Sequence, residues 1–274
     1  MTQSVEAVRR GRDSSTDAGE LRVALISTPR SGNTWFRHLV ATSLELEQMP
    51  IYNPLEADWA NLPGRCILMT HWHRTEPFLS LLHERDFHVL TLVRHPLDVL
   101  ISILHFTVHN PETGRWVNGD GGDELSIVGK SPLSQEFLEY AMSPRAMTLL
   151  SISSEWAQEP GSRLIRYEDL VADPRKVLLD VSYCDASQRT PSIVEAIAKN
   201  TLENLRAREG LHHWRGRPGH WRQFLPKDLA LKIADFHAET FTAFGYTCDP
   251  DATLTREQAQ ANWNESLCVP KLEA

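Results

Sequence analysis

Short apolar runs recur along the chain and are separated by longer stretches with helical spacing. The runs are residues 21–28 (LRVALIST), 65–71 (RCILMTH), 87–94 (FHVLTLVR) and 162–168 (SRLIRYE). Their length predicts strands, and the many β-branched residues and leucines of the second and third runs are typical of central parallel strands. The apolar spacing between runs predicts helices over residues 35–48, 96–106 and 228–246.

Strands that alternate with helices predict an α/β fold class, with a central parallel sheet flanked by helices on both faces. A chain of 274 residues is long for one domain and short for two, so we expect a single domain. Ligands of such folds bind at the carboxyl ends of the strands. The site is therefore expected beside residues 28–35, 70–73 and 94–102.

Two segments lack this periodicity. Residues 1–20 are polar, without the apolar core of a secretion signal, so we expect a flexible leader before a domain over residues 21–274. Residues 106–135, with NGDGGDE at their centre, predict a long loop. Long loops over such a sheet often shape the entrance for a substrate.

Charge and composition narrow the classes of partner. The net charge is -8, which disfavours a nucleic-acid partner and favours a neutral or cationic small molecule. The four cysteines lie far apart without metal-ligand spacing, so neither a disulfide framework nor a zinc site is indicated. No apolar run reaches the roughly 18 residues of a membrane span, so we expect a cytoplasmic protein without a membrane partner.

Residues 29–35, PRSGNTW, join the first predicted strand to the first helix. Backbone N–H groups in such a loop and the helix dipole behind it form a site for an anion. A Walker A loop would place a lysine after its last glycine. Here the basic residue, Arg30, precedes Gly32, which disfavours an ATPase or a kinase.

A second cluster follows the third strand, in the segment RHPLDVLIS. Arg94 at the strand end and Ser102 on the following helix can converge on one phosphate, to which the arginine makes a bidentate contact. Asp98 falls in the first turn of that helix. We expect its carboxylate to cap free N–H groups there rather than to act in catalysis.

Five segments together resemble the motifs of one enzyme family. They are PRSGNTW (29–35), MTH (69–71), RHPLDVLIS (94–102), LIRYEDL (164–170) and WRGRPGHWR (214–222). They resemble P(K/R)SGTTW, KTH, RxPxDxxxS, RYEDL and RKGxxGxW of the sulfotransferases that use 3'-phosphoadenylyl sulfate (PAPS). The resemblance implies the cytosolic or bacterial small-molecule type, with a fold similar to that of P-loop nucleotide kinases.

The first motif implies contacts to the 5' end of the donor. By resemblance, Arg30 contacts the 5'-phosphate and the sulfonate that is transferred, which makes it both a binding and a catalytic residue. The loop donors come from four further residues, which are Ser31, Gly32, Asn33 and Thr34. Trp35 would stack on the adenine, and a purely structural core aromatic is the alternative.

The second motif implies a general base. By resemblance the base is His71, and an imidazole with an ordinary pKa near 6.5 is largely neutral at pH 7 and able to accept a proton. His73 is the rival candidate for this role. Met69 stands where the family has lysine, so one contact to the phosphosulfate is either missing or supplied by another residue.

The remaining motifs imply contacts to the nucleoside. By resemblance, Arg94 and Ser102 hold the 3'-phosphate, Tyr167 hydrogen-bonds the adenine, and Leu202 makes an apolar contact with the purine. The glycine-containing loop over the 3'-phosphate contains Arg215, Gly216 and Arg217. Either arginine is a candidate for its anchor.

The resemblance implies a transferase that moves a sulfuryl group from PAPS to a hydroxyl or amine of a small molecule, releasing 3'-phosphoadenosine 5'-phosphate (PAP). It implies no metal ion. Two alternatives stay open, an ATP-dependent small-molecule kinase and a non-catalytic nucleotide-binding module. The walls of the acceptor site are expected from residues 48–62, 72–84, 103–135 and the tail after 247. The identity of the acceptor and the oligomeric state are left open.

Overall fold

The computed structural model describes residues 19–51, 53–109, 123–181, 186–209 and 216–267. A five-stranded sheet with the order β2-β3-β1-β4-β5 lies at its centre, and every pair of neighbouring strands is parallel. The strands are β1 (Leu21–Ile26), β2 (Glu47–Pro50), β3 (Arg65–Thr70), β4 (Phe87–Val93) and β5 (Arg163–Arg166). The predicted parallel α/β fold is therefore confirmed.

The central strand β1 is buried on both faces, because its side chains alternate between two hydrophobic cores. Ala24 and Ile26 belong to one core, whereas Val23 and Leu25 belong to the other, and all four are fully buried. A strand covered on both faces needs apolar residues at successive positions, which explains the apolar run from Val23 to Ile26.

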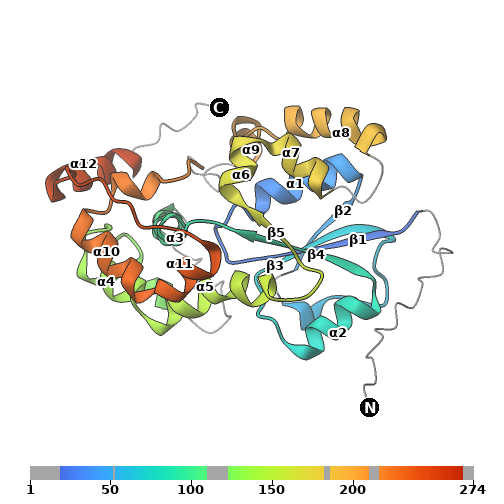
Figure 1. Ribbon diagram of the computed structural model, residues 1–274, viewed down its shortest axis with the longest axis horizontal. Helices are drawn as coiled ribbons and strands as arrows, with labels where there is room; N and C mark the ends of the chain where they lie inside the picture. The colour runs from blue at the N-terminus through green and yellow to red at the C-terminus, as the bar shows by residue number, and fades with distance from the viewer. Residues whose placement is uncertain (1–18, 52, 110–122, 182–185, 210–215, 268–274) are drawn as a thin grey trace, which may run out of the picture.

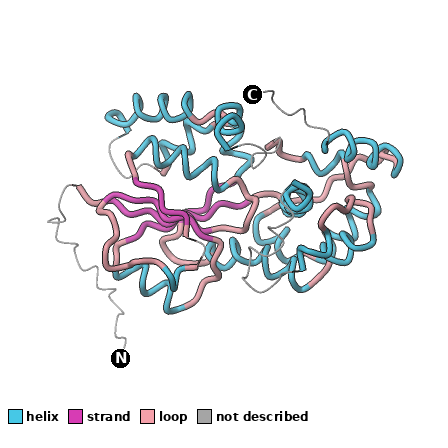
Figure 2. The backbone as a smooth tube through the Cα atoms, turned by 180° about the vertical axis from the view of Figure 1, so that it is seen from behind, coloured by secondary structure: helices cyan, strands magenta, loops and turns pink. Residues whose placement is uncertain are grey.

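Helices cover both faces of the sheet (Figures 1 and 2). One face packs against α1 (Asn33–Leu44), α6 (Tyr167–Ala172), α7 (Pro174–Asp180), α8 (Ala186–Lys199) and α9 (Leu202–Glu209). The other core contains α2 (Glu76–Glu84), α3 (Pro96–His109), α4 (Gln135–Ala141), α5 (Pro144–Ala157), α10 (Lys227–Phe236), α11 (Ala238–Phe244) and α12 (Arg256–Leu267). Short 3-10 helices occur at η1 (Pro54–Glu56), η3 (Asp123–Ile127) and η5 (His220–Gln223).

Three predicted elements differ from the structure. The helix expected over residues 35–48 ends at Leu44, and the polar segment EQMP after it forms the edge strand β2. The expected helix 228–246 is interrupted at His237, whose buried Nε2 lies 2.7 Å from the carbonyl oxygen of Ala141. Helix α3 continues to His109, inside the segment predicted as a loop.

Other expectations on these segments are not tested. Residues 110–122 of the predicted long loop and residues 1–18 of the predicted leader lie outside the described residues. In the ranges that are described, no helix is both long and apolar enough to cross a membrane.

Candidate active site

The loop after β1 is folded sharply at the carboxyl edge of the sheet. Arg30 and Gly32 both have left-handed backbone conformations, with φ of +65° and +101°. The side chain of Asn33 is buried, donates to the carbonyl of Thr28 at 3.1 Å and also contacts the Ser27 hydroxyl. Asn33 therefore holds the loop together, so that α1 begins directly after Gly32 with its N-terminus facing the site. This is the geometry of an anion site.

Helix α5 makes hydrogen bonds to this loop that the sequence did not predict. The Ser153 hydroxyl accepts from the backbone N–H of Thr28 at 2.8 Å and donates to the carbonyl of Leu92, at the end of β4, at 2.9 Å. The Trp156 indole donates to the carbonyl of Trp72 at 2.8 Å. One helix therefore joins the loop between β1 and α1 (residues 27–32, the phosphate loop) to the ends of β3 and β4. No local pattern could indicate a contact across 125 residues.

Two arginines meet at the loop. Arg94, which follows β4 and is buried, donates to the carbonyl oxygen of Arg30 at 3.2 Å and lies over the Tyr167 ring at 4.6 Å. Arg30 donates through Nε to the Ser102 hydroxyl at 3.2 Å and lies over the Phe106 ring at 4.3 Å. The structure thus brings together Arg30, Arg94 and Ser102, three of the residues predicted to bind phosphates.

The electrostatics of this cluster favour an anionic ligand. Burial, together with the charge of Arg94, lowers the pKa of Arg30 to about 10, so the Arg30 side chain remains cationic at pH 7. In addition, the buried Ser31 Oγ and Arg94 Nε atoms have no hydrogen-bond partner within the described residues. Buried polar groups are normally hydrogen-bonded, and adjacent like charges repel. A bound phosphate would form hydrogen bonds with these atoms and would reduce the repulsion between the two arginines.

His71 follows β3 and lies beside this loop. Its Nδ1 is 2.8 Å from the carbonyl oxygen of Ser27. A carbonyl only accepts, so Nδ1 carries the proton and Nε2 presents a lone pair. Burial is the main cause that lowers the pKa of His71, to about 4, and the charge of Arg30 adds to it. The imidazole is therefore neutral at pH 7 and able to accept a proton.

The rival histidine has a different environment. His73 places Nδ1 3.0 Å from both carboxylate oxygens of Glu155 on α5, and the same carboxylate accepts from the backbone N–H of Arg74 at 3.1 Å. This carboxylate therefore holds the segment that follows His71. Among the described contacts, it is His71 and not His73 that is bonded to the phosphate loop.

Tyr167, at the start of α6, closes the other side of the loop. Its hydroxyl donates to the carbonyl of Gly216 at 2.6 Å, so a bond to adenine would use the lone pairs of this oxygen. Its ring lies against Gly32, where an added Cβ would be 2.5 Å from two ring carbons. Trp35 is also buried, donates to the carbonyl of Asn200 at 2.9 Å and meets Tyr167 edge to face. Adenine stacking on Trp35 stays a prediction.

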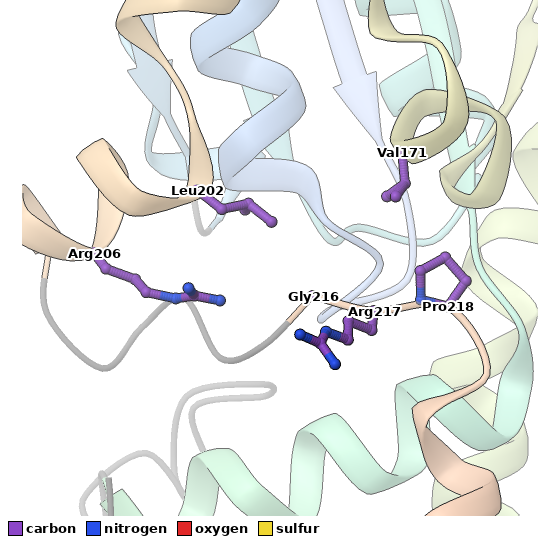
Figure 3. Close-up of a pocket in the computed structure, with 6 residues that line it drawn as sticks. All are labelled: Val171, Leu202, Arg206, Gly216, Arg217 and Pro218. Atoms are coloured by element: carbon purple, nitrogen blue, oxygen red, sulfur yellow. The ribbon is translucent and has the colours of Figure 1, made fainter. Parts of the chain in front are cut away.

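A pocket of about 500 Å³ lies beside Gly216, the residue whose carbonyl accepts from Tyr167 (Figure 3). Its walls include Leu202, Gly216 and Arg217, three of the residues predicted to bind the nucleotide, and they come from α9 and the segment before η5. The lining residues that sequence reasoning missed are Val171, Arg206 and Pro218. Arg215, the other candidate for the anchor of the 3'-phosphate, lies outside the described residues.

Asp98 corrects one expectation. Its carboxylate does cap backbone N–H groups, but they belong to η5 and not to its own helix: it accepts from Gly219 at 2.7 Å and from Trp221 at 3.0 Å. The carboxylate on α3 thereby fixes the glycine-containing segment beside Arg94. Since the two segments are more than 120 residues apart, only the tertiary structure could indicate this pairing.

Comparison with known proteins places this site in a family. A model described as a sulfotransferase domain matches residues 21–245. The chain belongs to the sulfotransferase family. Its general activity is therefore sulfuryl transfer, and all five motif segments lie inside the matched range. Helix α12 lies beyond that range.

Solved structures support the same fold. A mouse sulfotransferase, SULT7A1, solved in complex with PAP, is similar with a TM-score of 0.59 and 16% identity, over 82% of this chain and 86% of that one. A retinol dehydratase, solved with androsterone and inactive cofactor PAP, is similar with a TM-score of 0.52 and 14% identity, over 85% of this chain and 82% of that one. No curated protein sequence is significantly similar to this chain. At these identities the likeness shows that this sulfotransferase shares their fold.

Proposed function

We propose that this sulfotransferase carries the sulfuryl group of PAPS to a hydroxyl or amine of a small-molecule acceptor, with His71 as the general base. The observation that carries the proposal is the position of the imidazole. Its Nδ1 is bonded to Ser27, at the foot of the phosphate loop, so Nε2 is the nitrogen left to accept a proton. The solved neighbours support the donor and the acceptor class, since both contain PAP and one contains androsterone.

The residues of the site fit such a donor. The left-handed loop at residues 30–32 and the N-terminus of α1 suit the 5'-phosphosulfate, whose charge Arg30 would share. Arg94 and Ser31 have buried polar atoms that a phosphate would satisfy. The pocket beside Leu202 offers an apolar wall and an arginine for the nucleoside end. None of these contacts requires a metal ion.

The reaction is a single in-line displacement. The acceptor oxygen or nitrogen bonds to sulfur, its proton passes to Nε2 of His71, and the bond between sulfur and the bridging oxygen breaks to release PAP. Negative charge grows on that oxygen. Cationic Arg30 and the N–H groups at the start of α1 stabilise this charge more in the transition state than in the ground state.

Binding of PAP, measured by titration calorimetry without added metal, tests the donor site directly. We expect the wild type to bind PAP in preference to ATP, and Arg94→Ala to weaken the affinity for PAP by about 10- to 100-fold, because a charge-assisted contact is lost. Arg256→Ala is the matched control, since this arginine is exposed and pairs with Asp228 on the surface. Failure of the wild type to bind PAP, or a preference for ATP with magnesium, would refute the proposal.

The pH dependence tests the state of His71. Because burial lowers its pKa to about 4, the base stays neutral above that value and loses its lone pair only as the pH falls through it. We therefore expect kcat/KM for the donor to be nearly constant between about pH 8 and pH 5.5, and to decrease below that range. A midpoint between pH 6 and 7 would show a histidine with an ordinary pKa and would contradict the buried neutral base.

A further inference from the structure

Arg37 lies one turn into α1 and shares a helix face with Asn33 and Thr34, the first residues of that helix. Residues three and four positions apart lie on the same face, and Cα–Cβ bonds in a helix tilt toward its N-terminus. One turn rises about 5.4 Å, which an extended arginine side chain spans. The guanidinium of Arg37 therefore extends toward the end of α1 that faces the phosphate loop.

The contact with Met69 shows where this guanidinium lies relative to β3. Nη1 of Arg37 is 3.9 Å from Sδ of Met69, near the carboxyl end of β3 and two positions before His71. Arg37 is half-buried between α1 and β3. A thioether is a weak acceptor, so this contact helps to orient the guanidinium beside β3. The guanidinium therefore lies beside the carboxyl end of β3, the strand that His71 follows.

We infer that Arg37 is a catalytic residue that contacts the 5'-phosphosulfate of the donor. The inference rests on the proposed donor site and adds a cation to it that none of the five motif segments includes. Met69 stands where the family motif has a lysine, so β3 supplies no charge at this position. In this chain the charge comes instead from the neighbouring helix, and a bidentate guanidinium can contact two oxygens of the phosphosulfate.

Two ligands that differ only at the 5' end provide the test. PAP has a 5'-phosphate, whereas adenosine 3'-monophosphate lacks it and keeps the 3'-phosphate. For Arg37→Met we expect the affinity for PAP to fall by about 10- to 100-fold and the affinity for adenosine 3'-monophosphate to stay within about twofold. Arg256→Met removes the same charge from an exposed surface pair and should change neither affinity.

A charge relocation makes the test independent of folding defects. The double variant Arg37→Met/Met69→Lys moves the cation from the helix to the strand, at nearly the same place. We expect it to recover most of the affinity for PAP, whereas Met69→Lys alone would bring two cations together and lower the melting temperature. Thermal unfolding of each variant verifies that it is folded at the temperature of the titration.

The outcomes separate this inference from the proposed function. If the wild type does not bind PAP, the donor site itself is wrong. If the wild type binds PAP and Arg37→Met retains that affinity, the role of Arg37 is overturned and the donor site stands. Equal losses for both ligands, or no recovery in the double variant, would also overturn it, because Arg37 would then support the fold and not the 5' end.

Discussion

His71→Asn is expected to lower the rate of sulfuryl transfer by about 10²- to 10⁴-fold, the range for loss of a general base. The asparagine amide can still donate to the Ser27 carbonyl in place of Nδ1, so the loop keeps its shape while the lone pair of Nε2 is lost. The affinity for PAP should therefore remain that of the wild type. The measurement is single-turnover transfer from labelled PAPS to an acceptor selected by screening the wild type.

His73→Asn is the matched control for this variant. It changes the same residue type two positions along the chain and removes an imidazole that pairs with Glu155. We expect less than a tenfold effect on the rate, caused by looser positioning of the segment after β3. If His73→Asn lost more activity than His71→Asn, the two histidines would have to exchange roles.

Gly32→Ala is expected to lower the stability of the fold strongly and to abolish nucleotide binding. The added methyl group would lie 2.5 Å from two carbons of the buried Tyr167 ring, on a backbone with φ of +101°. A left-handed conformation costs an alanine about 1–2 kcal/mol, and overpacking a rigid site costs about 1–3 kcal/mol. The sum, about 2–5 kcal/mol, is a large part of the 5–15 kcal/mol typical of folded proteins. Urea unfolding would measure the loss.

The variant Gly161→Ala separates the cost of the left-handed conformation from the cost of the contact with Tyr167. The φ of Gly161, +94°, is nearly that of Gly32, but an added Cβ would have no atom within 4 Å. Gly161→Ala should therefore cost only the conformational term, about 1–2 kcal/mol, and leave PAP binding intact. If the two variants had equal stabilities, contact with Tyr167 would not be the reason why residue 32 is glycine.

The sequence was most informative where one local rule decides the structure. β1, β3 and β4 lie inside the sheet and are mostly apolar and buried, so their positions could be predicted from short runs of letters. The edge strand β2 was missed, because three of its four residues are largely exposed or polar and it leaves no apolar pattern. The break at His237 was missed for a related reason, since the apolar spacing continues across it.

In the site, too, local sequence patterns predicted some features, and contacts between distant segments decided others. Arg30, His71 and Arg94 each follow a strand, and parallel strands end at one edge of the sheet, so their proximity follows from chain order alone. By contrast, the support from Ser153, the pairing of Asp98 with η5 and the approach of Arg37 to Met69 join segments that are distant in the chain.

The sequence by itself determined the family and the fold class and predicted the residues of the donor site, because those depend on motifs within single strand-loop-helix units. Only the tertiary structure decided which histidine is bonded to the phosphate loop, which tautomer of His71 that bond selects and where Arg37 contacts Met69. These properties depend on burial and on directions of side chains from separate elements. Such contacts form only when the chain packs, and no spacing in the sequence encodes them locally.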